Sequence, residues 1–489
     1  PIWRHEAEVG GLRPGERLAY SVSSTAADGT VVGSSQFSLS ATPPAGQPLK
    51  ILLTSDHQMM PMTAANLQKV QDTIGQVDGV FLAGDLVNIP DRASEWFDDT
   101  RGGAFFPCLQ GRGSYTLEKN GSRTVYKGCQ LIQHAPLFPA IGNHEVMGRY
   151  GTALDLGDQF NDPVPWAAAK TLYDSYESIF NPTSDIRVQR RWLENHSFNI
   201  DTYNEIFSLP KASRDRGQTQ RYYATTFGDV RLVSLYVTQI WRVPAVNDKK
   251  RGRYQESAAD IDNPVSWGHG QFIFEGIEPG SPQYEWLQTE LASDAFQQAR
   301  YKIVMMHHPA HTLGGNVVPA FTTPVPVYDR DDVGNLIGIR YEYPKDDDHI
   351  VKHLLPLLED AGVQLVFYGH SHIWNRFESD SGMQFLESSN VGNSYGAHLA
   401  DNPRQVPNDP RYVETYDATG DPNGLPPILP TRQPLVDDDS GQPLPYIASN
   451  DVTAFSILDT ESGTVSSYYF GAREPDSEAV WFDVFRLGR

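Results

Sequence analysis

The clearest pattern along the chain is a series of apolar runs that each end in small and polar residues. Residues 49–56 (LKILLTSD) and 78–85 (DGVFLAGD) are two such runs, and residues 63–76 between them have apolar positions at helical spacing. Continuous apolar runs are typical of strands that are buried on both faces. The order strand, helix, strand predicts a βαβ unit whose polar residues gather at the carboxyl edge of a parallel sheet.

Later apolar segments repeat this arrangement of a helix that leads into a buried strand. The predicted elements are helices at 280–296 and 351–362, strands at 301–309 and 363–372, and hairpins at 221–237 and 453–470. The stretch 92–220 is rich in loops and prone to helix, and it is interrupted by 137–145 (LFPAIGNHE). Because this stretch lies between the predicted motif strands, we expect it to line the entrance of a site.

The first 46 residues have a different pattern, with three short predicted strands and a Gly-Leu-Arg-Pro-Gly turn at 11–15. The turn resembles a corner of a fibronectin-type sandwich, but three strands are fewer than the seven or so that such a fold needs. Either the front of that domain is absent, or these strands pack against the next domain. We therefore predict two units, a partial fibronectin type III-like segment at 1–46 and a catalytic domain at 47–489.

The net charge of the chain limits the classes of molecule that it can bind. The chain has 39 basic and 61 acidic residues, a net charge of −22. A surface this acidic repels phosphates of nucleic acids and anionic lipids, which argues against a polynucleotide partner. An anionic small substrate would need cations in its site to reverse the local field. No apolar run reaches the length of about 20 residues that a spanning helix requires, and no signal peptide is recognisable.

The chain has two cysteines, Cys108 and Cys129, on either side of a polar loop. A disulfide that closes a loop of this size contributes on the order of 3 kcal/mol. Two free thiols are the alternative. We favour the disulfide, and with it an exported protein that is secreted or periplasmic.

Five polar blocks stand at the ends of predicted strands. Taken singly, a Gly-Asp pair is most often a turn and a lone histidine is most often a packed or solvated residue. Together, the carboxylates, amide and imidazoles are donors that suit Mn, Fe or Zn, and a shared carboxylate can bridge two cations roughly 3.5–4 Å apart. The five blocks are Ser55-Asp56-His57-Gln58, Gly84-Asp85, Gly142-Asn143-His144-Glu145, His307-His308-Pro309 and Gly369-His370-Ser371-His372.

In this order, the blocks resemble those of the calcineurin-like metallophosphoesterase superfamily. Residues 366–377 (VFYGHSHIWNRF) are similar to the Gly-His-x-His-x-Tyr-x-Arg block of its purple acid phosphatase branch, with Trp374 at the aromatic position and Arg376 retained. The resemblance implies an α/β fold, a calcineurin-like β-sandwich flanked by helices and preceded by the short all-β fibronectin-like segment.

The resemblance also implies a two-metal site in which Asp85 bridges the cations. The ligands it implies are Asp56, Asp85 and His372 for the first metal, and Asp85, Asn143, His307 and His370 for the second.

Three other histidines receive roles from the same resemblance. His144 would act with Asp85 in catalysis, as an outer-sphere group that hydrogen bonds the phosphoryl oxygens or protonates the leaving group. His308 and His311 are candidates for substrate binding, although packing is an equal alternative for His308. His311 is considered because Gly314, Gly315 and Asn316 stand where purple phosphatases carry a histidine pair.

The sequence departs from the family pattern at two positions. Gln58 stands where most superfamily members have histidine, and Asn88 stands where the purple branch has its metal-binding tyrosine. Gln58 could coordinate only through its neutral amide oxygen, and it is kept as a further candidate ligand. His57 should point away from Asp56 if the segment is extended. We expect no ferric–tyrosinate colour and favour Mn or Fe over Zn.

The expected function is hydrolysis of a small phosphate ester, most often a monoester, by in-line attack of a hydroxide held by two divalent metal ions. A phosphodiesterase or a broad phosphate- and phosphonate-ester hydrolase is the alternative within the enzyme class. An exported binding protein with a degenerate metal site is the alternative from another class. Comparison of monoester with diester turnover separates the first two, and metal content separates both from the third.

Overall fold

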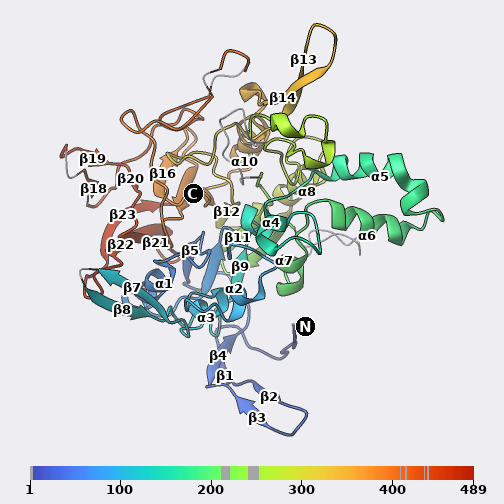
Figure 1. The fold of residues 1–489 in the computed structure, drawn as a ribbon. Helices are drawn as coiled ribbons and strands as arrows, with labels where there is room; N and C mark the ends of the chain where they lie inside the picture. The colour runs from blue at the N-terminus through green and yellow to red at the C-terminus, as the bar shows by residue number, and fades with distance from the viewer. Residues whose placement is uncertain are drawn as a thin grey trace.

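Two β-sheets, packed face to face and covered by helices on their outer sides, form the centre of the molecule (Figure 1). The computed structural model describes residues 4–119, 121–210, 221–240, 253–407, 409–412, 416–433, 435–437 and 440–488.

The first sheet has six strands, in the order β23-β22-β21-β5-β6-β9. Strands β5, β6 and β9 are parallel to one another, and β21, β22 and β23 complete the sheet in antiparallel fashion. Their bounds are β5 (Lys50–Thr54), β6 (Gly79–Leu82), β9 (Leu137–Pro139), β21 (Val452–Asp459), β22 (Thr464–Gly471) and β23 (Val480–Arg486).

The second sheet has seven strands, in the order β10-β11-β12-β15-β17-β16-β20. Four neighbouring strands, β11, β12, β15 and β17, are parallel. The bounds are β10 (Tyr223–Phe227), β11 (Val230–Ser234), β12 (Tyr301–Met305), β15 (Leu365–Tyr368), β16 (Trp374–Glu378), β17 (Gln384–Ser388) and β20 (Tyr446–Ile447).

Alternate residues of the parallel strands form the core between the sheets. Ile51 and Leu53 of the first sheet are in one apolar cluster with Ile303, Met305 and other residues of the second. Each of these four side chains is completely buried. The neighbouring positions on the same strands face outward, which explains why both strands are apolar along their whole length in the sequence.

The outward positions pack against helices. On the first sheet, Leu52 shares a cluster with Leu67 and Val70 of α1 (Thr63–Ile74). On the second, Val304 and Val366 share a cluster with residues of three helices. Those helices are α8 (Pro282–Leu291), α9 (Asp294–Gln297) and α10 (Leu355–Asp360). This four-layer arrangement confirms the predicted β-sandwich flanked by helices, with its βαβ unit at β5-α1-β6.

Two predicted helices are interrupted, for local reasons. The segment 280–296 forms two helices because Ser293 begins a new one, its hydroxyl accepting a hydrogen bond from the Phe296 amide at 3.2 Å. The segment 351–362 begins with a wide π-turn at Ile350–Leu354 and continues as α10. Pro356 lacks the N–H that a regular helix would use there, and the wide turn accommodates that loss.

The prediction from sequence omitted the strand pair β16 and β17, although the two predicted hairpins formed as expected. Charged residues in these strands hide the apolar pattern that would have predicted them. Arg376 of β16 is nevertheless buried, with its Nε 3.1 Å from Asp483 Oδ2 on β23. Arg376 also donates to Gln384 Oε1 at 3.0 Å. The arginine that resembles a purple phosphatase motif therefore joins the two sheets.

Several smaller elements surround the sandwich (Figure 1). The first segment has four strands in two small antiparallel sheets, β1 with β4 and β2 with β3, and Tyr20 Oη donates to the Gln133 carbonyl at 2.8 Å. Whether this segment is a partial fibronectin domain stays a prediction. The surrounding elements are β1 (Arg17–Tyr20), β2 (Ser23–Thr25), β3 (Val31–Gly33), β4 (Phe37–Ser40), α2 (Ala93–Phe97), α3 (Phe105–Leu109), β7 (Tyr115–Lys119), β8 (Ser122–Tyr126), α4 (Leu156–Phe160), α5 (Trp166–Phe180), α6 (Ile186–His196), α7 (Asp201–Ile206), β13 (Val325–Arg330), β14 (Leu336–Glu342), β18 (Leu435–Val436) and β19 (Pro443–Leu444).

The expected disulfide is not formed. Cys108 and Cys129 are both free and buried, although the Cys129 amide donates to the Cys108 carbonyl at 2.9 Å. Burial raises the pKa of each thiol to about 12, so both stay protonated and pack as small apolar side chains in the cluster around α1. The location outside the cytoplasm, which was inferred from that disulfide, stays a prediction. Among the described helices, none has both the length and the apolar character needed to cross a membrane.

Candidate metal centre

The predicted ligands come together where the carboxyl ends of the parallel strands of both sheets meet. All six side chains are buried. Asp56 follows β5, Asp85 follows β6, Asn143 follows β9, His307 follows β12, and His370 and His372 follow β15. The topology therefore brings together residues that lie hundreds of positions apart in the sequence.

Four of these residues have a backbone conformation that is unfavourable for a residue with a side chain. Their φ angles are positive: 54° at Asp56, 57° at Asp85, 83° at His370 and 56° at His372. Positive φ is uncommon outside glycine, and clusters of such residues are characteristic of functional sites. The fold holds these strained turns in place so that the side chains converge.

Glycines before the ligands allow the loops to approach one another closely. A Cβ added at Gly142 would lie 2.2 Å from Asp85 Oδ1, and one added at Gly369 would lie 2.2 Å from Asp56 Oδ2. Real contacts of this kind do not occur at such distances, so any larger residue would displace the carboxylates. The Gly-Asn-His and Gly-His-Ser-His blocks thus need their glycines for steric reasons.

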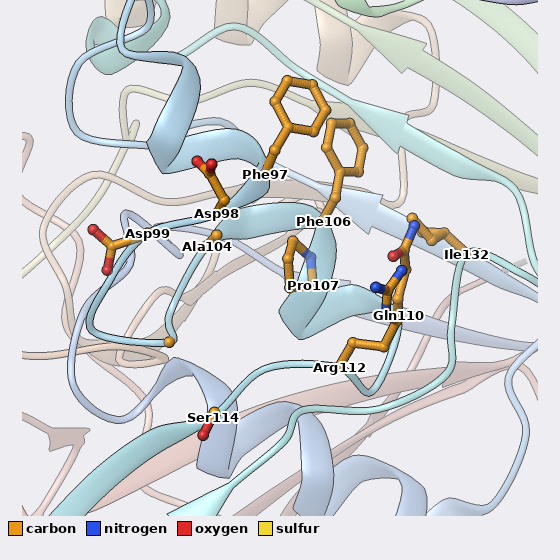
Figure 2. A pocket seen from close by; sticks show the side chains of 11 residues that line it. Phe97, Asp98, Asp99, Ala104, Phe106, Pro107, Gln110, Arg112, Ser114 and Ile132 are labelled. Atoms are coloured by element: carbon orange, nitrogen blue, oxygen red, sulfur yellow. The ribbon is translucent and has the colours of Figure 1, made fainter. Parts of the chain in front are cut away.

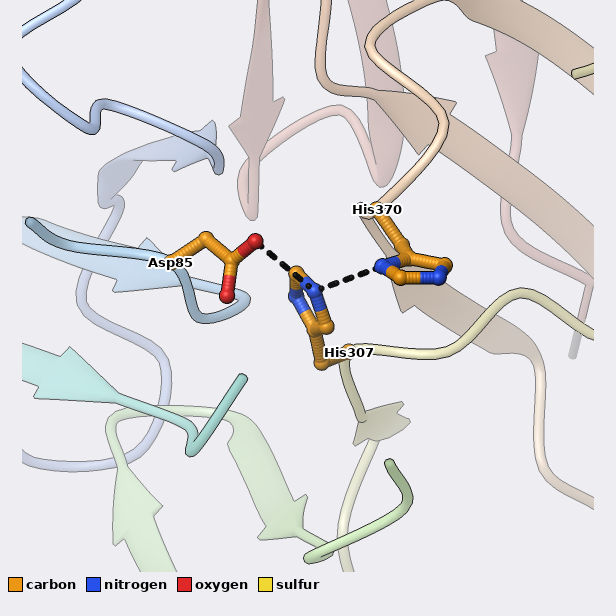
Figure 3. Close-up of side chains that lie close together, drawn as sticks. All are labelled: Asp85, His307 and His370. Atoms are coloured by element: carbon orange, nitrogen blue, oxygen red, sulfur yellow. Dashed lines mark hydrogen bonds and ion pairs between the residues drawn. The ribbon is translucent and has the colours of Figure 1, made fainter. Parts of the chain in front are cut away.

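One group of donor atoms surrounds His307 Nε2 (Figure 3). This atom lies 3.2 Å from Asp85 Oδ2, 3.2 Å from Asn143 Oδ1 and 3.1 Å from His370 Nδ1. The other ring nitrogen of His307 donates to the Ala83 carbonyl at 2.7 Å, which fixes the tautomer and directs Nε2 inward. Asp85, His307 and His370 can hold one metal ion, and Asn143 adds a neutral oxygen.

The charges in this group are those of a cation site. Burial alone would raise the pKa of Asp85, but His307 and His144 hold it well below its ordinary range. Burial alone would lower the pKa of His307, and Asp85 raises it to about 10. The fully buried carboxylate therefore requires a positive charge beside it, which a proton or a metal ion can supply.

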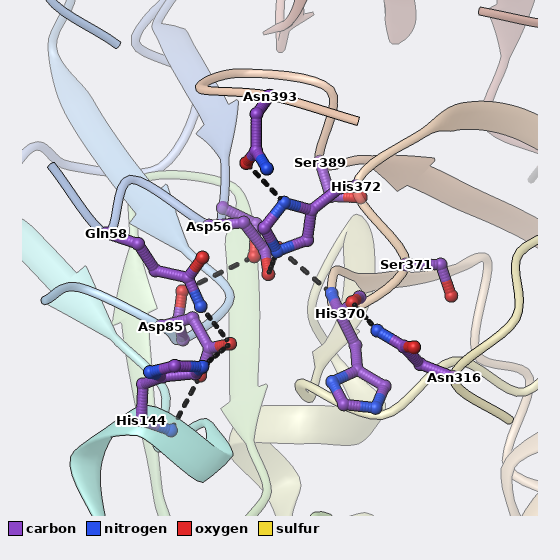
Figure 4. Close-up of polar contacts among 12 residues, drawn as sticks. Asp56, Gln58, Asp85, His144, Asn316, His370, Ser371, His372, Ser389 and Asn393 are labelled. Carbon is purple, nitrogen blue, oxygen red and sulfur yellow. Dashed lines mark hydrogen bonds and ion pairs between the residues drawn. The ribbon is translucent and has the colours of Figure 1, made fainter. Parts of the chain in front are cut away.

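A second group forms around Asp56 and shares Asp85 with the first (Figure 4). His372 Nε2 lies 3.2 Å from Asp56 Oδ1, and the His370 amide donates to Asp56 Oδ2 at 3.0 Å. The other nitrogen of His372 donates to Asn393 Oδ1 at 2.6 Å. Asp56, Asp85 and His372 can hold another metal ion, and Asp85 is the only member common to both groups.

Gln58 also lies in this cluster. Its Nε2 donates to Asp85 Oδ2 at 2.8 Å, and its amide oxygen is buried without a hydrogen-bond partner. An unsatisfied buried oxygen is a group that a cation would satisfy. A role for Gln58 as a weak, neutral ligand of the Asp56 group stays a prediction.

His144 is oriented by the residue that stands at the family's tyrosine position. Its Nδ1 donates to the Asn88 carbonyl at 2.7 Å, and its Nε2 lies 4.0 Å from Asp85 Oδ2. The side chain retains 13% of its exposure, whereas the six ligands are almost completely buried. His144 is therefore more exposed than the ligands beside it, and Asn88 contributes through its backbone.

Two buried glutamates support the ligand loops from behind. Glu145 accepts hydrogen bonds from the amides of Gly142, Asp85 and Leu86 at 2.7, 2.9 and 2.8 Å. Glu387 accepts from the Ser371 amide at 2.9 Å and from Asn375 Nδ2 at 3.0 Å, and burial raises its pKa to about 8.

These glutamates and the ligand carboxylates place four buried acidic side chains around one centre. Divalent cations would offset the charge of the two ligand aspartates, so the donor set fits the two-metal site that the sequence implied.

Three further histidines of the sequence motifs lie outside the two ligand groups. His57 shares a hydrogen bond with Thr54 at 2.9 Å and packs against Phe105, as expected for a side chain turned away from Asp56. His308 is buried with its ring 5.1 Å from that of His370, a packing position. His311 donates to Asp421 Oδ2 at 2.8 Å. Substrate binding by His308 and His311 stays a prediction.

The segment 92–135 forms a cavity of about 590 Å³ next to α2 and α3 (Figure 2). Asp98, Asp99 and Arg112 line it together with Phe97 and Phe106. None of the candidate metal ligands is among its lining residues. The expectation that 92–220 lines the entrance to the metal centre stays a prediction.

Sequence reasoning missed Asn393 and Tyr395, which both lie beside His372. The Tyr395 ring lies 4.4 Å from the His372 ring, centroid to centroid, and Asn393 hydrogen bonds to both side chains. Both residues follow β17, a parallel strand whose carboxyl end is at the same edge as the other ligand loops. Recognition of 384–388 as a strand would have directed attention to the loop after it.

No curated protein matches the chain. The solved structures that are similar in part include the following three. Purple acid phosphatase PPD1 from yellow lupin (Lupinus luteus) seeds is 14% identical, with a TM-score of 0.49 over 97% of this chain and 60% of the lupin chain. PhoD is 12% identical, with a TM-score of 0.42 over 93% and 73% of the two chains. A dimetal phosphatase from Danio rerio is 11% identical, with a TM-score of 0.36 over 89% and 100%.

The chain thus spans about 60% of the length of the lupin protein. The family model for calcineurin-like phosphoesterases matches residues 49–374, which include every candidate ligand. Members of this family are metal-dependent phosphoester hydrolases with a dinuclear metal centre. On that match, the chain belongs to the calcineurin-like phosphoesterase family.

Proposed function

We propose that the chain hydrolyses small phosphate esters, with monoesters preferred, at the two ligand groups that share Asp85. The observation that carries this proposal is the shared carboxylate: Asp85 belongs to both groups of donor atoms, and each group has its own histidine or histidines. A bridging carboxylate between two sites is the arrangement that two-metal hydrolases use for in-line displacement at phosphorus.

Two divalent cations, when bound, would supply Lewis acidity toward the phosphoryl oxygens and would lower the pKa of water to about 7. The protein's part is to hold the ligands in fixed positions before the substrate arrives. Hydrogen bonds to Ala83 and Asn393 fix the rings of His307 and His372 respectively, so each directs its Nε2 at a carboxylate. Such fixed donors need no reorganisation during the reaction.

His144 is the residue that we assign to the leaving group. Its Nδ1–H is committed to the Asn88 carbonyl, so Nε2 is the atom that can hold a proton toward the substrate. Nε2 lies 4.0 Å from Asp85 Oδ2, and the His144 side chain is 13% exposed, so a proton on this atom would be held next to the shared carboxylate. Donation of a proton from this atom to the departing oxygen is general acid catalysis.

For the metals we propose Mn²⁺ or Fe²⁺ in preference to Zn²⁺. Carboxylates supply the Asp56 group with most of its donors, and the amide oxygen of Gln58 is the additional one available. Shells rich in oxygen suit Mn²⁺ and Fe²⁺ better than they suit Zn²⁺. Since Asn88 contributes no phenol, a ferric–tyrosinate absorption from this position is not expected.

The test compares the wild-type protein with Asp85→Asn after both are loaded with Mn²⁺. We expect about two metal equivalents in the wild type and hydrolysis of p-nitrophenyl phosphate in preference to bis(p-nitrophenyl) phosphate. D85N should lose at least about a hundredfold in kcat/KM and bind less metal. The control is Asp380→Asn, an exposed carboxylate in the turn after β16.

Each alternative function has its own outcome. Full turnover by D85N with metal still bound would refute the two-metal assignment. Faster hydrolysis of the diester would point to a phosphodiesterase. A wild-type protein that binds no metal would identify a binding protein with a degenerate site instead.

A further inference from the structure

The loop that follows β17 is held rigidly beside the metal centre. The Met62 amide donates to the Gly392 carbonyl at 2.9 Å, and Ser394 exchanges hydrogen bonds with Asn450 at 2.9 and 3.1 Å. Asn390 Nδ2 donates to the Val452 carbonyl at 2.7 Å. The loop is thereby fixed to α1 on one side and to β21 on the other, so the residue at its end has a defined position.

That residue, Tyr395, packs one side of its ring on a candidate ligand. The ring planes of Tyr395 and His372 are 35° apart, with 4.4 Å between centroids. Tyr395 is 48% exposed, whereas His372 and Asp56 are buried. Part of the ring therefore covers His372, and the remainder faces solvent.

The phenol of Tyr395 is held in place. Its hydroxyl hydrogen bonds with the Asn393 side chain. Asn393 is the same residue that accepts the hydrogen bond from His372. The exposed part of Tyr395 is thus an aromatic surface with a fixed orientation.

Tyr395 and His144 lie beside different members of the ligand cluster. His144 is beside Asp85, and Tyr395 is beside His372. Both are more exposed than the six ligands: the His144 side chain is 13% exposed and Tyr395 is 48% exposed. The ester substituent of a phosphoryl group held by the buried ligands can therefore meet either ring.

We propose that Tyr395 is a specificity-determining residue whose exposed ring contacts the leaving group of the ester, so that esters of aromatic or other planar-ring alcohols are preferred. This inference rests on the proposed phosphoesterase function. An aromatic contact of this kind favours a ring-bearing substrate by about two- to tenfold. The contact concerns the substituent alone, because the phosphoryl group is held by the buried ligands.

The experiment measures kcat/KM of the Mn²⁺-loaded protein for phenyl phosphate and methyl phosphate. Tyr395→Leu removes the ring, and Tyr395→Phe retains it. For each ester, the kcat/KM of the variant is divided by that of the wild type. This ratio removes the difference in intrinsic reactivity between the two esters. We expect Y395L to lower kcat/KM for phenyl phosphate about two- to tenfold more than kcat/KM for methyl phosphate, mainly through a higher KM. Y395F should keep the wild-type preference for phenyl phosphate. Tyr328→Leu, at a 49% exposed tyrosine of the β13–β14 hairpin, is the matched control.

Competitive inhibition by inorganic phosphate separates a substrate contact from structural support of His372. Phosphate has no leaving group, so its Ki should differ little between wild type and Y395L. An equal loss for phenyl phosphate, methyl phosphate and phosphate binding would overturn the proposal, and so would an unchanged phenyl-to-methyl ratio. If the wild type hydrolyses neither ester, it is the proposed function that fails.

Discussion

Asn393 Oδ1 accepts a hydrogen bond from His372 Nδ1 at 2.6 Å, and this contact sets the direction of the histidine's other nitrogen. With Nδ1 committed to Asn393, the Nε2 lone pair of His372 points toward Asp56 Oδ1, 3.2 Å away. Groups that orient a ligand in this way raise its basicity and fix its tautomer. A residue outside the sequence motifs therefore sets the geometry of the Asp56 group.

Replacement of Asn393 by alanine should weaken metal binding while the fold persists. Outer partners of metal ligands typically affect affinity by about 10- to 100-fold, and we expect a loss in that range for one of the two metals. Competition with a chromophoric chelator measures it. The control is Asn161→Ala, whose amide donates to the Gly157 carbonyl at the surface. Unchanged affinity and stoichiometry for N393A would show that His372 needs no such support.

Gly369→Ala should disrupt the Asp56 group by steric overlap, because Gly369 lies against the Asp56 side chain. The new Cβ would lie 2.0 Å from Ser55 Oγ and 2.2 Å from Asp56 Oδ2, so the carboxylate must move. We expect metal affinity to fall by at least about tenfold, in line with the loss of an orienting group. Gly33→Ala, in open space at the edge of the small β2–β3 sheet, is the matched control. Near-normal metal content in G369A would mean that the loop after β15 can shift without a loss of metal affinity.

His144→Gln should reveal the general acid through its dependence on the leaving group. We expect kcat for an alkyl phosphate to fall by about 10²- to 10⁴-fold, because the alkoxide needs a proton as it departs. The decrease for p-nitrophenyl phosphate should be much smaller, since nitrophenolate is a good leaving group without protonation. The exposed His5 offers a control, His5→Gln. Equal losses for both esters would assign His144 to substrate binding instead.

The sequence predicted the parallel strands and the position of the six candidate ligands at their carboxyl ends, because the signals are local. Each ligand directly follows an apolar run, and parallel strands bring their carboxyl ends to one edge. Asp56 and His372 could be placed together in this way although they lie in different sheets. Periodicity cannot reveal a partner such as Asn393, since its role depends on a 2.6 Å contact with a ligand from another loop.

The parts that were missed or wrong depend on burial, which the residue types concealed. Glu387 and Arg376 are typical surface residues in a sequence, yet both are buried and satisfied by several hydrogen bonds in the strand pair that the prediction omitted. Cys108 and Cys129 fitted a disulfide in a polar loop, but α3 and its surroundings enclose them as free thiols. The composition of the loop favoured a disulfide, whereas the packing around α3 keeps both thiols free.

The buried Glu387 predicts how the metal-free protein responds to pH. Burial, opposed by hydrogen bonds from Thr312 and Ser371, raises its pKa from 4.5 to about 8. A group with a raised pKa holds a proton in the folded state that the unfolded state has released. Its contribution to stability is therefore complete below about pH 4.5 and is lost as pH rises toward 8.

We accordingly expect the chelated protein to become less stable between pH 5 and 8. Glu387→Gln, which cannot ionise, should reduce the steepness of that decline by about 1.4 kcal/mol per pH unit. Denaturant titrations of the EDTA-treated proteins at several pH values measure the slope, which is informative even if E387Q is less stable overall. The control is Glu461→Gln, an exposed residue in the turn between β21 and β22. If the slope is the same in E387Q and wild type, Glu387 is ionised over the whole range from pH 5 to 8. The metal centre then has one more negative charge.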